Sequence, residues 1–399
     1  MRKPKKQLGV GGVYISALAK KYINQVLESA RLTHGPFTQK FEKEFAKEHN
    51  VRFAIFCNSG TSALQVGLHA LKKRYKWQDG DEVLVPAVTF PASSNTALQN
   101  RLKPVFVDVD PDFFEINPKE IEKHITKKTR AIMPVHLCGL PCDMEPILET
   151  AKEYDLKIIE DSCETVLAKY NGKPVGSWGD VSCFSTYAAH IIVTGVGGFA
   201  CTNNSQLAVD IKSLFNHGRD GIYLSIDDDK TADEDELFKI VKRRFNFIDI
   251  GYSYRATEME AALGLAQLKT IKKGIKKRNE NAAYLSEGLV DLERYLKLPQ
   301  IRPDSSHSFQ MYPLVCNRGV DRNKLTFYLE KNLIETRYLL PLLNQPIYKE
   351  VFGDIEKKYP VARMLNQKAF YIGCHTELTK KGLDYIIYHF HQYFENKKL

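Results

Sequence analysis

The sequence predicts an α/β protein whose large domain has a mainly parallel sheet, followed by a smaller C-terminal α+β domain. Three observations predict this fold. Short β-rich runs alternate with helical patterns through the first half of the chain, small polar and acidic residues follow two of those runs, and the texture changes after Pro299. Alternating strands and helices are typical of parallel sheets covered on both faces. Ligands of such sheets bind at the carboxyl ends of the strands.

Each predicted element rests on its own local pattern. The runs rich in β-branched and apolar residues predict strands, and apolar residues at helical spacing predict helices. The strands are expected at 52–57, 82–86, 104–109, 131–135 and 157–160, with helices at 62–73 and 144–154. Beyond them lie a long helical pattern at 257–277, a strand-like run at 310–316 and helices near 322–331 and 381–394.

We expect the large domain to span residues 1–260, including an N-terminal segment of residues 1–35, and the small domain to span 261–399. The acidic stretch 226–236 is predicted to be an exposed loop. The basic start of the chain lacks the apolar core of a signal peptide and is interpreted as a solvated tail.

Composition and charge narrow the class of protein. With 43% hydrophobic and 26% charged residues the chain is an ordinary globular protein. Its net charge of +9 favours anionic ligands. The lysines are scattered without an interleaved aromatic stripe, so no nucleic-acid partner is expected. No apolar run approaches the roughly 20 residues of a membrane span, so no membrane partner is expected.

The eight cysteines favour a reduced, cytoplasmic setting over a disulfide scaffold. Cys138 and Cys142 are close in sequence, but they flank a turn and no second pair with metal-site spacing follows. Because zinc sites usually need four ligands, no metal site is predicted.

Two motifs follow predicted strands. Ser59, Gly60 and Thr61 open a helix, where free N–H groups and the positive dipole end can hold a phosphate. An ordinary helix cap is the alternative interpretation of that motif. Asp161 ends the strand-like run before it and could bind a cationic ring, although a helix cap or a surface acid fits the same pattern.

The segment 179–190 and the glycine-rich run 194–198 resemble the cofactor segment of the DegT/DnrJ/EryC1/StrS family of sugar aminotransferases, which use pyridoxal phosphate. The resemblance extends over nearly the whole chain, at 33–37, 80–83, 135–139, 216–219 and 251–258. It implies the pyridoxal phosphate-dependent transferase fold of type I, which is similar to that of aspartate aminotransferase.

His190 occupies the position where most of that family has a lysine bound covalently to the cofactor. Histidine cannot form that bond, but it can move protons near neutral pH. A small branch that resembles this chain, the nucleotide-sugar 3-dehydratases, carries histidine there. The alternatives are an engineered lysine-to-histidine mutant and a histidine that is simply satisfied in the core or on the surface.

The resemblance assigns further roles. It implies that Asp161 pairs with the ring nitrogen of the cofactor and that Phe90 stacks on its ring, although a phenylalanine is more often part of a core. It implies that Ser185 is a second phosphate donor. Glu164, an acid where common aminotransferases of the family have glutamine or histidine, would face the phenolic oxygen.

Other residues are implied to complete the site. Ser253 lies in a segment that resembles the part reaching the phosphate of a neighbouring subunit, where the family normally has asparagine. A serine hydroxyl can still donate that hydrogen bond, so a homodimer with shared sites is expected. His217, Arg219 and Arg337 are expected to contact substrate, with a surface arginine as the alternative interpretation of Arg337.

The leading hypothesis is 3-dehydration of a 4-keto nucleotide sugar through pyridoxamine phosphate, with glutamate as the amino donor that restores the amine. His190 would remove a proton from C4′ of the cofactor and help to expel the C3 hydroxyl, and the products would be a 3-deoxy sugar and ammonia. An iron–sulfur form is rejected because no cysteine lies between Cys201 and Cys316.

Two alternatives stay open. One is a nucleotide-sugar aminotransferase that works without a covalent lysine, and the other is a non-catalytic cofactor or nucleotide-sugar binding protein. The stretch 339–342 differs from the one associated with the characterised dehydratases, which points to a different substrate.

Overall fold

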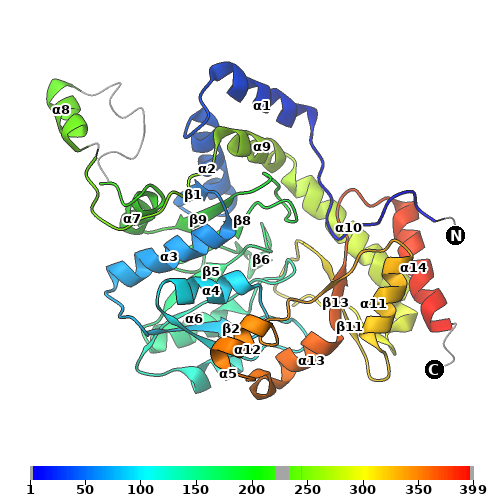
Figure 1. Cartoon of the computed structure of the whole chain (residues 1–399). Coiled ribbons are helices and arrows are strands. Elements are labelled where there is room, and N and C mark those ends of the chain that lie inside the picture. The colour runs from blue at the N-terminus through cyan, green and yellow to red at the C-terminus, as the bar shows by residue number, and fades with distance from the viewer. Residues whose placement is uncertain (1–2, 221–232, 244, 396–399) are drawn as a thin grey trace.

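A seven-stranded sheet forms the centre of the large domain in the computed structural model, which describes residues 3–220, 233–243 and 245–395 (Figure 1). Five neighbouring strands are parallel, and β9 runs antiparallel between β1 and β8. In the order of the sheet the strands are β1 (Phe53–Cys57), β9 (Gly198–Thr202), β8 (Val181–Ser185), β5 (Lys157–Asp161), β4 (Thr129–Ile132), β2 (Glu82–Pro86) and β3 (Lys103–Val107). The mainly parallel sheet is confirmed. The fourth predicted strand begins two residues and ends three residues earlier than expected.

Helices cover the sheet because their apolar sides pack on it. Leu64, Leu68 and Leu71 of α3 are fully buried in one core with β2 and β5 residues. The helix begins where predicted, since the Ser59 side chain accepts a hydrogen bond from the Ser62 N–H group. The helices of this domain are α1 (Ala17–Ser29), α2 (Pro36–Glu48), α3 (Gly60–Arg74), α4 (Pro91–Gln99), α5 (Pro118–Ile121), α6 (Met144–Glu153), α7 (Ser205–Phe215), α8 (Glu234–Arg243) and α9 (Glu258–Leu268).

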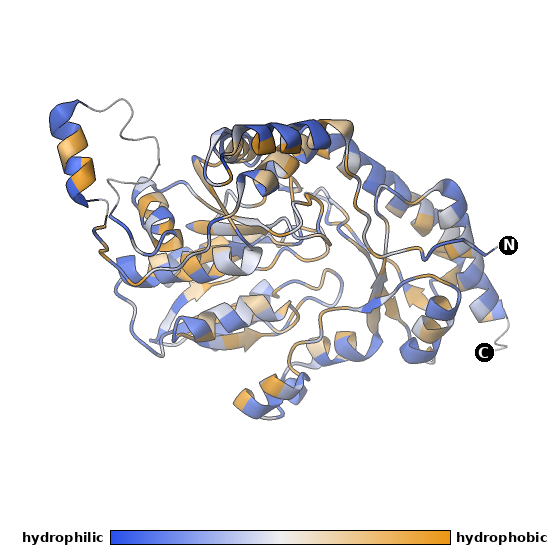
Figure 2. Cartoon of the chain, turned by 45° about the horizontal axis from the view of Figure 1, so that its top comes forward, coloured by the Kyte–Doolittle hydropathy of each residue, from blue (hydrophilic) through white to orange (hydrophobic). Residues whose placement is uncertain are grey.

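Helix α8 projects away from the rest of the domain (Figure 1), and Figure 2 shows apolar residues along it. Phe238 is 70% exposed. The predicted acidic loop 226–236 lies partly outside the described residues, and its end, Glu234–Glu236, is the first turn of α8 rather than a loop. Acids in the first turn and Lys242 and Arg243 in the last turn match the helix dipole, which explains the helix.

The small domain has a four-stranded antiparallel sheet in the order β10-β11-β13-β12. Its core joins the sheet to α10, α11 and α14 through buried side chains such as Leu285, Tyr312 and Phe370. The predicted strand at 310–316 and the two predicted helices are confirmed. The elements are α10 (Ile271–Leu289), β10 (Leu296–Lys297), β11 (Tyr312–Cys316), α11 (Arg322–Lys331), β12 (Arg337–Tyr338), α12 (Pro346–Phe352), α13 (Pro360–Lys368), β13 (Ala369–Ile372) and α14 (Lys380–Glu395).

The helical pattern at 257–277 is two helices, α9 and α10, which are interrupted at Lys269 and Thr270. Helix α9 packs on α1 and α2, and Ala261 and Leu265 belong to the core of the large domain. The expected division after residue 260 therefore cuts through α9. We propose a boundary at Thr270 instead, because α10 packs on α14 of the small domain.

The segment before α1 packs on the small domain. Leu8 forms a bridge with Ile334, and the Val10 N–H group donates to Glu335 Oε2 at 2.8 Å. Gly373 lies so close to this segment that a Cβ there would come within 2.1 Å of the Gly9 carbonyl oxygen. The start of the chain thus stabilises the edge of the small sheet. Among the described residues no helix has the length and apolar character needed to cross a membrane.

Candidate active site

The predicted phosphate site lies where the start of α3 meets the end of β8. A Cβ at Gly60 would come within 2.7 Å of Cys163 Sγ and 2.8 Å of Ser185 Cβ, so only glycine fits there. The Ser59 hydroxyl caps α3 and bonds Ser62 Oγ at 2.9 Å. Because the Ser62 and Ala63 N–H groups already donate to Ser59, the groups that we assign to an anion are the N–H group of Thr61 and the hydroxyls of Thr61 and Ser185.

Asp161 is the last residue of β5 and is 4% exposed, which excludes a surface acid. Its Oδ2 accepts a 2.7 Å hydrogen bond from the Ser93 hydroxyl, and its Oδ1 accepts a 3.1 Å bond from the Cys163 N–H group. Ser93 is itself 2.7 Å from Thr89 Oγ1. These contacts hold a carboxylate at the carboxyl edge of the sheet, where the fold class predicts ligand binding.

Phe90 is the residue before α4 and its side chain is 58% exposed, so it is not a core phenylalanine. Its carbonyl oxygen accepts a 3.2 Å hydrogen bond from the N–H group of Ser93, the residue that also bonds Asp161. The beginning of α4 therefore connects an exposed aromatic ring, that of Phe90, with the buried carboxylate of Asp161.

Glu164 is half-buried, and its Oε2 accepts a 3.0 Å hydrogen bond from the Cys138 N–H group. Burial, with a smaller contribution from the negative charge of Asp161, raises the pKa of Glu164 to about 7. At neutral pH this carboxyl exists in both protonation states. It can therefore donate or accept a hydrogen at an oxygen placed opposite it.

His190 lies in the turn that follows β8. Its N–H group donates to the Tyr187 carbonyl oxygen at 2.9 Å, and the Thr194 N–H group closes the loop onto the Thr186 carbonyl oxygen at 2.8 Å. Burial lowers the pKa of His190 to about 4, so the ring is neutral at physiological pH. A neutral ring can take up a proton from a reacting carbon or oxygen.

Gln310 is a site residue that the sequence did not reveal. Its Nε2 lies 3.0 Å from His190 Nδ1, and its backbone N–H group donates to the Cys138 carbonyl oxygen at 3.0 Å. Since the Cys138 N–H group also bonds Glu164, one chain of contacts joins His190 to Glu164. In the sequence, Gln310 is only an amide residue at the start of an apolar run. No rule of spacing connects it with residue 190.

Ser253 and His217 belong to a second, exposed cluster around Arg255. The Arg255 guanidinium lies 2.8 Å from Ser253 Oγ and 3.3 Å from His217 Nε2. Arg255 also forms a bridge with Cys57, at the end of β1. The cluster therefore begins beside the phosphate site and faces outward.

Two predicted substrate residues lie elsewhere. The Arg219 guanidinium lies over the rings of Phe245 and Phe247, with its central carbon 5.3 and 5.6 Å from their centroids. Arg337, on β12, pairs with Glu335 and is 53% exposed. It stands opposite Tyr371 in the sheet, and burial together with the charge of Glu164 raises the Tyr371 pKa while Arg337 lowers it. Arg337 and Glu164 thus act on the Tyr371 hydroxyl with charges of opposite sign.

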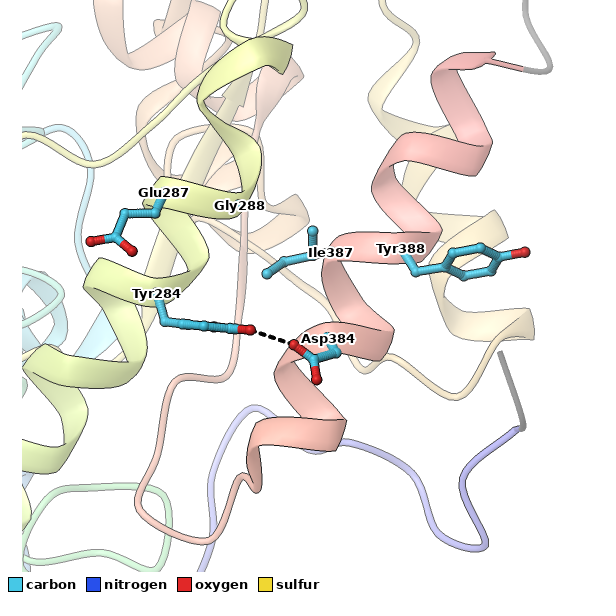
Figure 3. A pocket seen from close by; sticks show the side chains of 6 residues that line it. All are labelled: Tyr284, Glu287, Gly288, Asp384, Ile387 and Tyr388. Atoms are coloured by element: carbon cyan, nitrogen blue, oxygen red, sulfur yellow. Dashed lines mark hydrogen bonds between the residues drawn. The ribbon is translucent and has the colours of Figure 1, made fainter.

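A groove between α10 and α14 contains none of these residues (Figure 3). The Tyr284 hydroxyl donates to Asp384 Oδ1 at 2.5 Å across it. Its other lining residues are Glu287, Gly288, Ile387 and Tyr388. The groove belongs to the packing of the small domain, away from the loop of His190.

The sequence and the fold are similar to those of known proteins. The profile of the DegT/DnrJ/EryC1/StrS aminotransferase family matches residues 14–391. GDP-perosamine synthase of Escherichia coli O157:H7 is 33% identical over 380 residues, which are 95% of this chain and 96% of the relative. The crystal structure of a GDP-4-keto-6-deoxymannose-3-dehydratase histidine-to-asparagine mutant with bound GDP-perosamine is 26% identical, with a TM-score of 0.86 over 96% of this chain and 99% of that chain.

The E. coli GDP-4-keto-6-deoxy-D-mannose-3-dehydratase structure with bound hydrated pyridoxal phosphate is 25% identical, with a TM-score of 0.84 over 96% of this chain and 99% of that one. These likenesses confirm the predicted transferase fold and the predicted cofactor, pyridoxal or pyridoxamine phosphate. The residues present fit that cofactor. The start of α3 packs closely on Ser185 at Gly60, Asp161 is a buried acid and the ring of Phe90 is exposed.

Proposed function

The chain belongs to the DegT/DnrJ/EryC1/StrS aminotransferase family, whose pyridoxal phosphate enzymes act on nucleotide sugars, and we propose that it removes the C3 hydroxyl of a 4-keto nucleotide sugar. The observation that carries this proposal is His190. Its ring is neutral at physiological pH and cannot replace lysine as a covalent partner of the cofactor, but it can transfer protons.

The geometry supports an assignment of the cofactor-binding residues. Gly60, Thr61 and Ser185 would hold its phosphate, with Ser59 fixing the helix end. Asp161 would face the ring nitrogen, Phe90 the ring and Glu164 the phenolic oxygen. When bound, the cofactor supplies an amino group for the sugar ketone and a ring that takes up negative charge.

His190 is the acid–base group of the proposed reaction. Gln310 contacts Nδ1, so Nε2 is the ring nitrogen that we assign to proton transfer. His190 would take a proton from C4′ and return one to the C3 hydroxyl as that group leaves. Proton transfer by a positioned side chain contributes about 10²- to 10⁴-fold in rate, which is the loss expected when His190 is replaced by Asn.

The test supplies pyridoxal phosphate, glutamate and a 4-keto nucleotide sugar to the whole protein and analyses the products by mass spectrometry. Dehydration yields a sugar that has lost one oxygen atom and releases one ammonia for each sugar. An amino sugar formed without ammonia would replace this proposal with aminotransfer. A sugar that binds and returns unchanged would support the non-catalytic alternative.

A second experiment examines the missing lysine directly. The protein is loaded with pyridoxal phosphate, reduced with borohydride and digested, and the peptides are weighed. We expect no covalent adduct in the wild type and an adduct at position 190 in the His190→Lys variant, which serves as the positive control. An adduct on any other lysine of the wild type would contradict the role of His190.

We also propose a homodimer in which Ser253, His217 and Arg255 complete the site of the neighbouring subunit. These side chains are exposed beside the phosphate site, and α8 carries an apolar face that is open in one protomer. Light scattering tests this with Phe238→Asp on the apolar face. We expect this change to yield monomers, whereas Lys239→Asp on the same helix leaves dimers. A monomeric wild type would refute the proposal.

Arg337 and Arg219 remain candidates for contacts with the nucleotide, because the net charge of +9 favours an anionic substrate. For the cellular location we propose the cytoplasm. All eight cysteines are free thiols, which suits a reducing compartment.

A further inference from the structure

The side-chain amide of Gln310 faces His190 in one definite orientation. Its Nε2 lies 2.7 Å from the Ala189 carbonyl oxygen and 3.0 Å from His190 Nδ1. A carbonyl oxygen can only accept hydrogen bonds, so the NH₂ end of the amide must face Ala189. The same NH₂ group therefore donates its other hydrogen to Nδ1.

This contact decides where the ring carries its proton. A neutral imidazole has one nitrogen that donates and one that accepts. Since Nδ1 accepts from Gln310, the proton of the neutral ring is on Nε2. Burial and the positive charge of Arg278, from α10, both disfavour a second proton on the ring.

A ring in this state cannot act as a base through Nε2, because the lone pair of that nitrogen is replaced by an N–H bond. The backbone of Gln310 is fixed on both sides, by its N–H bond to Cys138 and by Arg278, whose guanidinium donates to the Gln310 carbonyl oxygen at 3.0 Å. The side-chain amide is therefore the part that can turn. Gln310 Oε1 is buried and has no hydrogen-bond partner within the described part of the chain.

We propose that Gln310 is a positioning residue that keeps the proton of resting His190 on Nε2, and that its amide turns over when the ring becomes a base. In this step Nε2 releases its proton to a water molecule and Nδ1 takes one from water, so that in the turned orientation Oε1 accepts from the Nδ1–H group and Nε2 has a lone pair for the proton of C4′. The turned amide also brings Oε1 against the Ala189 carbonyl oxygen, which makes this orientation the less stable one at rest. The catalytic meaning of the switch rests on the proposed function, whereas the resting tautomer does not.

The tautomer can be read without any substrate. The whole protein is labelled with ¹⁵N-histidine, long-range ¹H–¹⁵N correlations are recorded, and His190 is assigned from the signals lost in His190→Asn. We expect a protonated Nε2 and an unprotonated Nδ1 in the wild type. An Nδ1–H tautomer in the resting protein would overturn the proposal.

Two variants at position 310 sharpen the measurement. Gln310→Glu presents only acceptors to the ring, so the proton should move to Nδ1 and the pKa of His190 should rise by about one unit or more. Gln310→Leu offers no hydrogen bond and should give a mixture of tautomers. A wild-type pattern in Gln310→Glu would contradict the proposed role.

Gln267 supplies the matched control. It holds the same loop three residues further on, with Oε1 accepting from the Val193 N–H group at 2.9 Å and Nε2 donating to the Val193 carbonyl oxygen at 2.8 Å. Gln267→Leu should loosen the loop and leave the proton of His190 on Nε2. If Gln267→Leu and Gln310→Leu shift the tautomer equally, Gln310 only supports the loop and the proposal fails.

Kinetic measurements then distinguish the proposed dehydration from the proposed positioning role of Gln310. If the protein dehydrates its sugar, Gln310→Leu should lower kcat by about 10- to 100-fold, as loss of an orienting partner typically does, with KM nearly unchanged. If no sugar is dehydrated, the reaction assigned above fails while the tautomer result stands on its own.

Discussion

The Ser93 hydroxyl lies 2.7 Å from Oδ2 of Asp161 and donates a hydrogen bond to it. This contact joins the first turn of α4 to the last residue of β5. Because Phe90 precedes the same turn, one helix start positions both the acid and the aromatic ring that we propose bind the cofactor. The acid is thereby held before any ligand binds.

Replacing Ser93 by Ala should weaken pyridoxal phosphate binding about tenfold, since a hydrogen bond to a charged group is worth about 1.5–3 kcal/mol. Ser94→Ala is the matched control, because Ser94 is buried beside it but its hydroxyl interacts with Tyr348 rather than with Asp161. Dissociation constants from the cofactor absorbance provide the measurement. Equal affinities in the two variants would contradict the role of Ser93.

Gly60→Ala should lower both stability and phosphate affinity. The added Cβ would meet Cys163 Sγ and Ser185 Cβ at less than 3 Å, and overpacking of this kind costs about 1–3 kcal/mol. Gly274→Ala, where the Cβ would meet Thr376 at an ordinary 3.8 Å, should instead stabilise its helix by about 0.5–1 kcal/mol. Thermal melts with and without pyridoxal phosphate distinguish the two. A cofactor-induced shift in Tm that survives in Gly60→Ala would argue against this cradle.

Glu164→Gln should stabilise the cofactor-free protein at alkaline pH. The pKa of this carboxyl is about 7 in the folded state against an ordinary 4.5, so the folded state binds the extra proton and stability falls as the pH rises between those values. Removing the charge should raise the free energy of unfolding at pH 8.5 by about 1–3 kcal/mol. The gain should shrink toward pH 4.5. Urea melts across this range check the trend, and a gain independent of pH would exclude this explanation.

His49 should make the protein sensitive to mild acid. Its ring is fully buried and stacked on Phe45, and burial lowers its pKa to about 4. Below pH 6.5 the His49 ring binds a proton in the unfolded chain but stays neutral in the folded protein. The free energy of unfolding therefore falls as the pH falls. Between pH 7 and pH 5 the wild type should lose about 2 kcal/mol more than His49→Phe. Denaturant melts at both values measure the difference, and parallel losses would show that His49 is not the cause.

The sequence predicted those parts of the molecule that local patterns determine. Ser59, Asp161 and Ser185 each follow or end an apolar run, and a strand's end is a fixed place in a parallel sheet. The break between α9 and α10 was not predictable, because Lys269 and Thr270 are neither proline nor glycine and both tolerate helix. The break arises because α9 packs on the large domain, whereas α10 packs on the small domain.

The contact of Gln310 with His190 could not be predicted from the sequence for another reason. It joins residues 120 positions apart, from different domains, and it depends on the orientation of an amide that no pattern encodes. Likewise, the exposed helix α8 carries acidic residues at its start that resemble a solvated loop, and its apolar side became visible only in three dimensions.

The place of β1 in the sheet affects how the protein folds while the ribosome synthesises it. This strand leads into the phosphate site, yet its partner in the sheet is β9, where Cys57 pairs with Gly198 about 140 residues later. Such non-local pairing delays folding, because the chain must close a long loop before the contact forms. In a chain that is still being synthesised, the candidate phosphate site is therefore incomplete until β9 has left the ribosome. Binding of the cofactor can then report that the large domain has folded completely.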